Sequence, residues 1–184
     1  VPDQSYPNPS IQRLQQADDL AQSLFNSCFD ICDGPDAPNV DVVELDREVV
    51  LMLSNPGSSN NFEEAYIEGG LGIPSGFDSL YRFEGYRVFQ FSGPEVSLAE
   101  IDDPDRVREI AQFDINNGVT EVFNWSPVNE EDNPLQDPYL IPSLQAKGTD
   151  NGIRHSLRIT QDAFASGNDT RLINHRRYYF TVVA

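Results

Sequence analysis

The hydrophobic period of this chain changes once, and the change constrains what the chain can fold into. Between residues 11 and 28, apolar side chains recur at the three- and four-residue spacing of an amphipathic helix. From Asn39 onward they alternate with polar side chains, which is typical of strands that are buried on one face. Most of the chain is therefore predicted to form β-structure, preceded by one helix.

Residues 1–35 are predicted to form an extended segment, one amphipathic helix and a linker. Ser10 is a suitable N-cap for a helix that spans about residues 10–27. The apolar stripe of this helix needs a partner surface, either on the following domain or on a domain upstream. Gly34 and Pro35 then interrupt the pattern, so the domain boundary is expected at this point.

Residues 36–184 are predicted to form an all-β sandwich with two long inserts. The expected strands span residues 40–45, 48–54, 81–91, 107–115, 119–125, 153–159 and 176–184. Asn117-Gly118 stands between two of these runs, and this dipeptide is a strong signal for a two-residue hairpin. Segments rich in Gly, Pro, Asn and Ser near residues 55–80 and 124–152 are expected as the inserts.

The closing residues carry a recognisable pattern. Leu172, Tyr178, Val182 and Ala184 stand at L-x5-Y-x3-V-x-A, which resembles the E–F loop and F strand of fibronectin type III domains. In that family the tyrosine hydroxyl bonds to backbone across the loop while the ring packs inside. The resemblance implies an immunoglobulin-like sandwich in which these four residues are structural.

Two further segments resemble the same family, and the chain also departs from it. Glu48–Pro56 resembles the B strand, and Phe83–Phe91 resembles the C strand, which implies that Tyr86 and Val88 lie in the core. The family usually has a buried tryptophan near the end of the B strand, where this chain has Leu53 and Ser54. The sequence stops at Ala184, where strand G would follow, so the last strand is expected to be missing.

Longer phrases resemble a particular class of bacterial protein. SNPGSSNNFEEAY, DSLYRFEGYRVFQF and NHRRYYFTVVA are similar in texture to modules of very large secreted surface proteins of Bacteroidota-type bacteria. Such proteins are commonly exported by the type IX secretion route. The resemblance implies an extracellular or cell-surface location.

Charge and hydropathy exclude several partners. The formal net charge of -18 would repel nucleic acid and anionic membrane surfaces. No apolar run approaches the length that spans a bilayer. We therefore expect no nucleic-acid partner and no direct membrane insertion, and we expect contacts with neighbouring domains of the same polypeptide or with other protein subunits.

Cys28 and Cys32 are the only cysteines, and three readings of the pair stay open. Their spacing allows a local disulfide if the helix ends between them, which a secreted protein would favour. They are otherwise two small buried thiols. A zinc site that adds His155 and His175 is formally feasible, although its spacing matches no common zinc pattern.

One acidic loop is a candidate cation site. Glu130, Glu131, Asp132 and Asp137 could supply oxygen ligands to calcium, but they lack the fixed spacing of an EF-hand. The alternative is that these side chains are simply solvated. We expect no cofactor beyond such a calcium ion.

No catalytic set is recognisable, so the protein is not expected to be an enzyme. The adjacent Glu63 and Glu64 would point apart, and neither histidine stands in the context of a catalytic triad. Aromatic residues in or beside the inserts could bind a glycan or could instead cover the sandwich. They are Tyr66, Phe77, Tyr81, Trp125 and Tyr139.

These observations favour a non-catalytic structural or adhesion module of a larger extracellular bacterial protein. One alternative is a filament subunit, because a sandwich without its last strand could accept a strand from a neighbouring subunit. Another is a carbohydrate-binding accessory module that uses the aromatic residues of the inserts.

Overall fold

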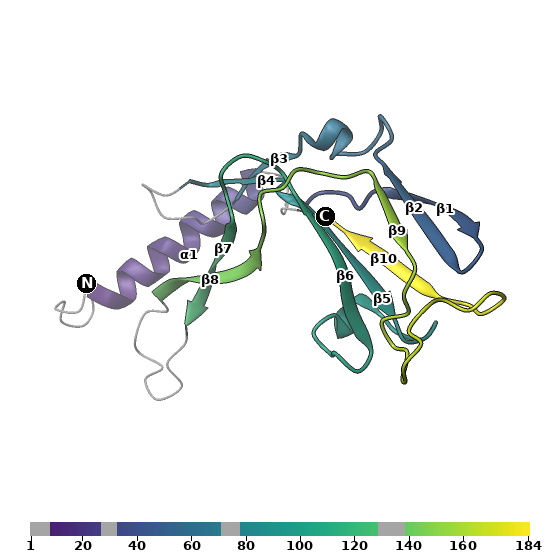
Figure 1. The fold of residues 1–184 in the computed structure, drawn as a ribbon. Helices are drawn as coiled ribbons and strands as arrows, with labels where there is room; N and C mark the ends of the chain where they lie inside the picture. The colour runs from purple at the N-terminus through teal and green to yellow at the C-terminus, as the bar shows by residue number, and fades with distance from the viewer. Residues whose placement is uncertain (1–7, 27–32, 71–77, 129–138) are drawn as a thin grey trace. The chain divides into compact units, whose positions relative to one another are not determined.

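The structure is a computed structural model, and it describes residues 8–26, 33–70, 78–128 and 139–184 (Figure 1). The helical elements are α1 (Asn8–Asn26) and the 3-10 turns Phe62–Glu64 and Leu98–Glu100. The strands are β1 (Asn39–Leu45), β2 (Glu48–Ser54), β3 (Ile67–Gly69), β4 (Leu80–Arg82), β5 (Gly85–Phe91), β6 (Val107–Asp114), β7 (Glu121–Val128), β8 (Tyr139–Lys147), β9 (Ser156–Ile159) and β10 (Tyr179–Val183). Antiparallel sheets dominate the described residues, so the prediction of an all-β, sandwich-like fold with one helix is confirmed.

The chain divides into two compact units. The helix unit consists of Val1–Pro35 and Asn60–Phe83, and the sandwich unit consists of Asp36–Ser59 and Glu84–Ala184. Much of the segment that we expected as the first insert of the sandwich therefore groups with the helix.

The helix unit contains α1 and the short β3–β4 hairpin. The helix begins two residues before the predicted N-cap, Ser10, and ends at Asn26. Ile11, Leu14 and Phe25 of its apolar pattern are exposed. In the other segment of this unit, the Phe83 N–H donates to the Tyr66 carbonyl oxygen at 3.2 Å, which extends the pairing of the hairpin.

Two three-stranded antiparallel sheets form the sandwich, and the same unit also contains the two-stranded β7-β8 sheet. The strand orders of the two sandwich sheets are β1-β2-β9 and β10-β5-β6 (Figure 1). Alternate residues of the central strands point into the core, because successive side chains of a strand face opposite ways. Leu51 and Leu53 from β2 and Tyr86 and Val88 from β5 are all buried there.

A second apolar cluster covers the outer face of the β10-β5-β6 sheet. Phe89 on β5 and Val107 on β6 are buried there against Val96, and Ile101 and Val183 pack around them. Val96 and Ile101 belong to the segment that links β5 to β6. That segment thus shields the outer face, and β5 is buried on both of its faces.

The prediction of a hairpin at Asn117-Gly118 is wrong, because the strands on either side of this turn do not pair with each other. β6 pairs with β5, whereas β7 pairs with β8 in a separate two-stranded sheet. The carboxylate of Asp150 accepts hydrogen bonds from the N–H groups of Asn117 at 2.8 Å and Gly118 at 3.1 Å. The turn is therefore bound to the segment after β8, and it directs the chain away from β6. The insert expected near residues 124–152 accordingly contains β8.

The single strand predicted over residues 81–91 is divided into β4 and β5. The physical reason lies at Gly85, where β5 begins. A Cβ atom on Gly85 would lie 2.1 Å from the carbonyl oxygen of Phe113 on β6. The backbone approaches β6 so closely that only glycine fits, and the strand that crosses the core starts at this contact.

We predict that Gly85→Ala destabilises the sandwich unit by about 1–3 kcal/mol, because the added methyl group must displace backbone. Gly69→Ala is the matched control, since nothing lies within 4 Å of the Cβ position of Gly69. The control should change stability by less than about 1 kcal/mol. Urea unfolding followed by circular dichroism measures both. Equal stability of the two variants would contradict the assigned close approach.

Candidate functional site

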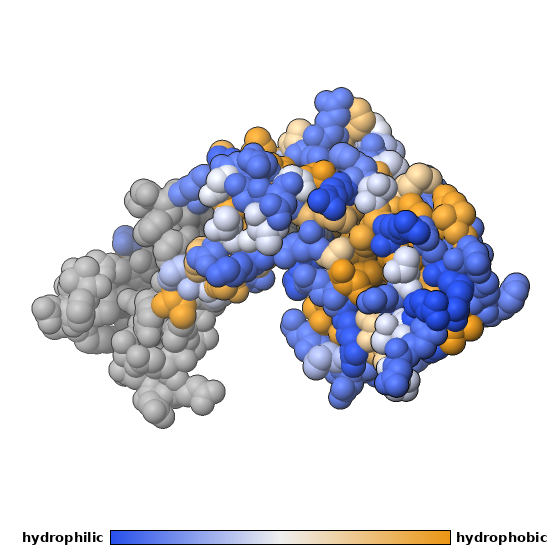
Figure 2. Space-filling view, in the orientation of Figure 1, coloured by the Kyte–Doolittle hydropathy of each residue, from blue (hydrophilic) through white to orange (hydrophobic). Residues whose placement is uncertain are grey.

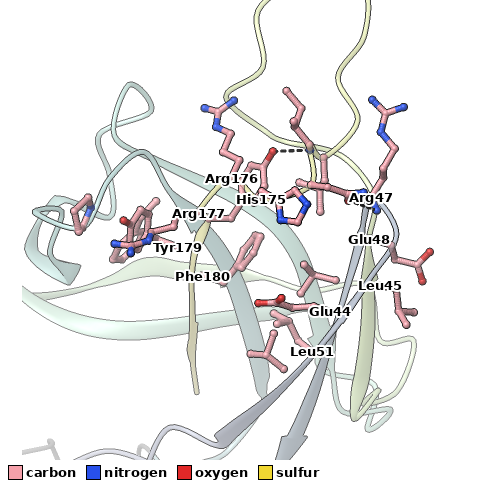
Figure 3. Close-up of a pocket in the computed structure, with 18 of the residues that line it drawn as sticks. Glu44, Leu45, Arg47, Glu48, Leu51, His175, Arg176, Arg177, Tyr179 and Phe180 are labelled. Atoms are coloured by element: carbon pink, nitrogen blue, oxygen red, sulfur yellow. Dashed lines mark hydrogen bonds between the residues drawn. The ribbon is translucent and has the colours of Figure 1, made fainter.

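A groove opens at one edge of the sandwich unit between β1 and β10 (Figure 3). Its volume is about 1060 Å³. Residues of β1, β2, β10 and the loop that precedes β10 line it, together with the end of β5 and the segment 93–96 that follows. In Figure 3, Phe180 of β10, Glu44 of β1 and Leu51 of β2 surround the same space. The groove thus reaches from the surface to the core between the two sheets.

The register of β1 explains why the groove is apolar. Val42 stands opposite Leu51 and Val40 stands opposite Leu53 on β2. Residues directly opposite in an antiparallel pair lie on the same face of the sheet. Leu51 and Leu53 are 1% and 5% exposed and lie in the core, so the two valines face the interior as well.

These two inward-facing valines remain uncovered. Val40 is 37% exposed and Val42 is 56% exposed, although their partners on β2 are buried. The β10-β5-β6 sheet therefore covers β2 but leaves β1 without an opposing strand among the described residues.

β10 lies at the edge of its own sheet beside this gap. It pairs with β5, and within the described ranges no strand pairs with its other side. An edge strand leaves a row of backbone N–H and C=O groups without partners in its sheet. Phe180 and Val182 stand opposite Gln90 and Val88, which are buried, so they present their side chains to the interior.

The side-chain amide of Asn174 connects the two walls at one end of the groove. The turn between β1 and β2 places Arg47 at φ 56, in the left-handed region. The Arg47 N–H donates to the side-chain oxygen of Asn174 at 2.7 Å, and the Asn174 amide donates to Asp46 at 2.7 Å. Asn174 therefore joins the β1–β2 turn to the loop that precedes β10 and fixes the separation of the two walls at this end.

Tyr178 fixes the loop that leads into β10. Its hydroxyl oxygen accepts a hydrogen bond from the Ile173 N–H at 2.8 Å. The neighbouring Leu172 is buried, and its N–H donates to the Thr160 carbonyl oxygen at 3.0 Å. The Arg176 guanidinium lies 5.4 Å from the centre of the tyrosine ring. These contacts set the position at which β10 enters the sheet.

A buried polar cluster below this loop is a feature that the sequence analysis did not single out. Gln90 and Asp162 are both buried, and the Gln90 amide donates to Asp162 Oδ1 at 2.7 Å. Gln90 also accepts from the Ala163 N–H at 2.8 Å, and Arg176 lies 3.2 Å from Asp162 Oδ2. One signal in the sequence could have indicated this cluster. Gln90 alternates with Tyr86 and Val88, which the resemblance placed in the core, and a polar side chain buried there needs a hydrogen-bond partner.

The groove has an apolar end and a charged end. Val40 and Val42 lie toward the start of β1, whereas Glu44, His175 and Arg177 line the end beside the β1–β2 turn. Among the described residues, neither the Glu44 carboxylate nor the Arg177 guanidinium has an ion-pair or hydrogen-bond partner. Groups of both signs are thus available at this end for an occupant.

Asp169 lies beyond this end, between two arginines. Its carboxylate contacts the Arg171 guanidinium at 2.8 Å and lies 3.8 Å from Arg47. Hydrogen bonds from Arg171 are the main cause that holds the pKa of Asp169 well below its ordinary value of 3.8, and Arg47 adds a smaller electrostatic contribution. The hydrogen bonds favour the charged form of the carboxyl.

The predicted metal and disulfide residues are not tested by this geometry. Glu130, Glu131, Asp132 and Asp137, as well as Cys28 and Cys32, lie outside the described residues. Among the residues that are described, no group of three or more His, Cys, Asp or Glu side chains is placed to hold a metal ion.

The remaining candidates are dispersed. His155 and His175 are exposed in the sandwich unit. Tyr66 is buried, and its hydroxyl donates to Glu68, whereas Tyr81 is exposed. Phe77 lies outside the described residues, and the side chains of Trp125 and Tyr139 are likewise not described. No described helix is both long and apolar enough to cross a membrane.

Comparisons of the chain with protein-family models, with curated proteins and with solved structures find no match. The function must therefore be argued from the groove, its walls and the sheets that hold them.

We predict that Tyr178→Phe lowers the free energy of unfolding by about 1 kcal/mol, because it removes the acceptor of the Ile173 N–H while it keeps the ring. Tyr179→Phe is the matched control, since the Tyr179 hydroxyl bonds to none of the described residues. Chemical denaturation measures both variants. A loss in Tyr179→Phe as large as that in Tyr178→Phe would contradict the role given to the hydrogen bond.

A carboxyl titration by NMR tests the charge arrangement around Asp169. We expect Arg171→Gln to raise the pKa of Asp169 markedly and Arg47→Gln to raise it only slightly. In the unmodified chain the folded pKa lies below the unfolded one, so the ionised carboxyl favours folding above about pH 4. That contribution is lost as the pH falls through the lowered pKa. A larger effect of Arg47→Gln would reverse the assignment.

Proposed function

We propose that the sandwich unit is a non-catalytic structural module of the fibronectin type III class within a larger extracellular or cell-surface protein, where it serves structure or adhesion. The observation that carries the proposal is the strand order. β1-β2-β9 and β10-β5-β6 match the A-B-E and F-C-C′ arrangement of that class. The order is informative because it requires β9 and β10 to join sheets built much earlier in the chain.

The loop before β10 supports the same assignment. The Tyr178 hydroxyl bonds to backbone five residues upstream, which is the contact expected for the tyrosine of such a sandwich. Leu172 and Val182, from the same sequence pattern, are buried. Tyr86 and Val88, which the resemblance assigns to the core, are buried as well.

A structural role is also consistent with how the interior polar groups are used. Gln90 and Asp162 bind each other and the backbone of Ala163 and Phe164. The carboxylate of Asp114, also buried, accepts from the Asp150 N–H at 2.9 Å. Each of these groups holds a loop against a strand. The net charge of -18 further suits a protein that remains soluble at high local concentration.

The proposal is tested on the native polypeptide. Antibodies raised against residues 1–184 are used to detect it in cytosolic, surface and culture-medium fractions, with a cytosolic enzyme as the fractionation control. We expect it at the surface or in the medium, with a denatured mass far above the 20.6 kDa of this chain. A cytosolic polypeptide would overturn the proposal.

A surface polypeptide with a mass near 20.6 kDa would instead favour the filament alternative. The open edge of β10 is the observation behind that alternative, since a strand donated by a neighbouring subunit could pair there. Sedimentation of the purified chain over a range of concentrations would then be expected to reveal polymers.

A further inference from the structure

We infer that two copies of this chain associate through β1, whose outer edges pair antiparallel about a two-fold axis at Val42 and join the two β1-β2-β9 sheets into one. The interaction surface is the edge of β1, and the partner is a second copy of the chain. The inference goes beyond the proposed function, because it names a binding partner and does not depend on where the protein is located.

The outer edge of β1 is open. β1 pairs with β2 on one side, and among the described residues no strand pairs with its other side. An edge strand of this kind presents a row of backbone N–H and C=O groups to which a further strand can bind. All seven residues of Asn39–Leu45 are exposed. The edge is therefore accessible to a partner along the full length of the strand.

β1 lacks the features that protect the other edges of the two sandwich sheets. The pairing of β6 with β5 contains a register shift, and β6 carries the charged residues Arg108 and Glu109. β9 and β10 are short, with 4 and 5 residues. β1 has 7 residues, contains neither proline nor a basic residue, and keeps an unshifted register with β2. Bulges, basic residues and short length protect edges from association, so β1 is the edge most suited to pairing.

β1 is also apolar on both of its faces. Val42 faces the interior and is 56% exposed, whereas Val43 and Leu45 face outward and are 39% and 53% exposed. Side chains of a neighbouring strand would flank both faces at once, because a paired strand places its own residues beside each of them. In Figure 2, hydrophobic residues lie at the end of the sandwich unit where Figure 1 places β1 and β2. A paired strand thus covers apolar surface that neither sheet of the chain covers.

The sequence of β1 is self-complementary about Val42. In an antiparallel pair with its axis there, Asp41 of each copy stands opposite Val43 of the other. Val40 stands opposite Glu44, and the whole strand is paired without a direct contact between like charges. An axis at Asp41 or at Glu44 would instead bring two carboxylates together, which is destabilising. An axis at Val43 would leave the first two residues of the strand unpaired.

The offset between the two sheets leaves room for the second copy. A two-fold axis between antiparallel neighbours is perpendicular to their sheet, so the β10-β5-β6 sheets of both copies lie on the same side of the joined sheet. In each copy the β10-β5-β6 sheet leaves β1 uncovered, as the exposure of Val40 and Val42 shows. Two uncovered strands therefore separate the two β10-β5-β6 sheets, and the pairing brings no second layers into collision.

The expected association is weak and closed. Two paired strands of 7 residues bury less than the roughly 1,200 Å² at which stable interfaces begin, so we expect a dissociation constant on the order of 100 μM. The net charge of -18 on each copy adds a repulsion that salt screens. A two-fold axis closes the assembly after two copies, so dimers are expected rather than polymers.

Sedimentation equilibrium of the 184-residue chain over a range of concentrations tests the dimer. Val42→Glu adds a carboxylate from each copy at the axis, near Glu44, and should weaken dimerisation by about tenfold or more. Leu98→Glu is the matched control, because Leu98 is 52% exposed and lies outside β1. The control should leave dimerisation unchanged. A chain that stays monomeric above about 1 mM or that forms polymers would overturn the inference, as would equal weakening by both variants.

A complementary pair of variants tests the position of the axis. Only with the axis at Val42 does this residue face its own counterpart, so a chain with Val42→Glu should dimerise with a chain that carries Val42→Lys. We expect this mixed dimer to be about tenfold or more tighter than the dimer of Val42→Glu with itself. Native mass spectrometry distinguishes the two by mass, and circular dichroism checks that both variants fold. A mixture with no such preference for the mixed dimer would overturn the inference.

Discussion

The burial of β5 on both faces is the constraint on which the sandwich unit depends. Tyr86, Val88 and Gln90 point into the core, while Phe89 packs against the segment that leads to β6. β10 and β6 both pair with β5, which is the central strand of their sheet. Its side chains also reach beyond the sheet, since the Tyr86 hydroxyl accepts from the Asn55 amide at 2.6 Å. Most side chains of β5 are buried, so few substitutions are tolerable in it, and the positions of β10 and β6 depend on it.

The groove follows from this arrangement combined with the pairing of β1. β10 is placed by β5 on one side and by the Tyr178 loop at its start. The position of β1 is set by its pairing with β2, in the opposite sheet. The two sheets are therefore offset at this edge, and the inward face of β1 extends past the last strand of the opposite sheet. Val40 and Val42 are exposed because of this offset.

Much of the fold was predictable because the local signals were strong where the elements are simple. β2 has the residues 48–54 that its alternation predicted, and the pattern around Tyr178 located both the loop and β10. The Asn117-Gly118 signal failed for a tertiary reason. Asp150, more than thirty residues away, binds the amides of the turn, and no local pattern contains that partner.

The groove itself was less accessible to prediction. Alternation along β1 identifies two faces but not which of them meets the core, and only the pairing with Leu51 decides the matter. The division between β4 and β5 likewise depends on a backbone contact of Gly85 with Phe113. In the sequence alone, aromatic residues recur on both sides of Gly85, from Tyr81 to Phe91, and suggest one continuous strand.

The pairing of β10 with β5 has a consequence for how the protein is made. Thr181 pairs with Phe89, and Val49 pairs with Ile159, so both sheets are closed by residues that leave the ribosome long after their partners. Contacts this distant in sequence are formed late and slow folding. During synthesis, before β10 is available, one backbone edge of β5 has no partner strand and its aromatic side chains are incompletely covered. A cell that produces this protein would need to protect that strand until β10 has emerged.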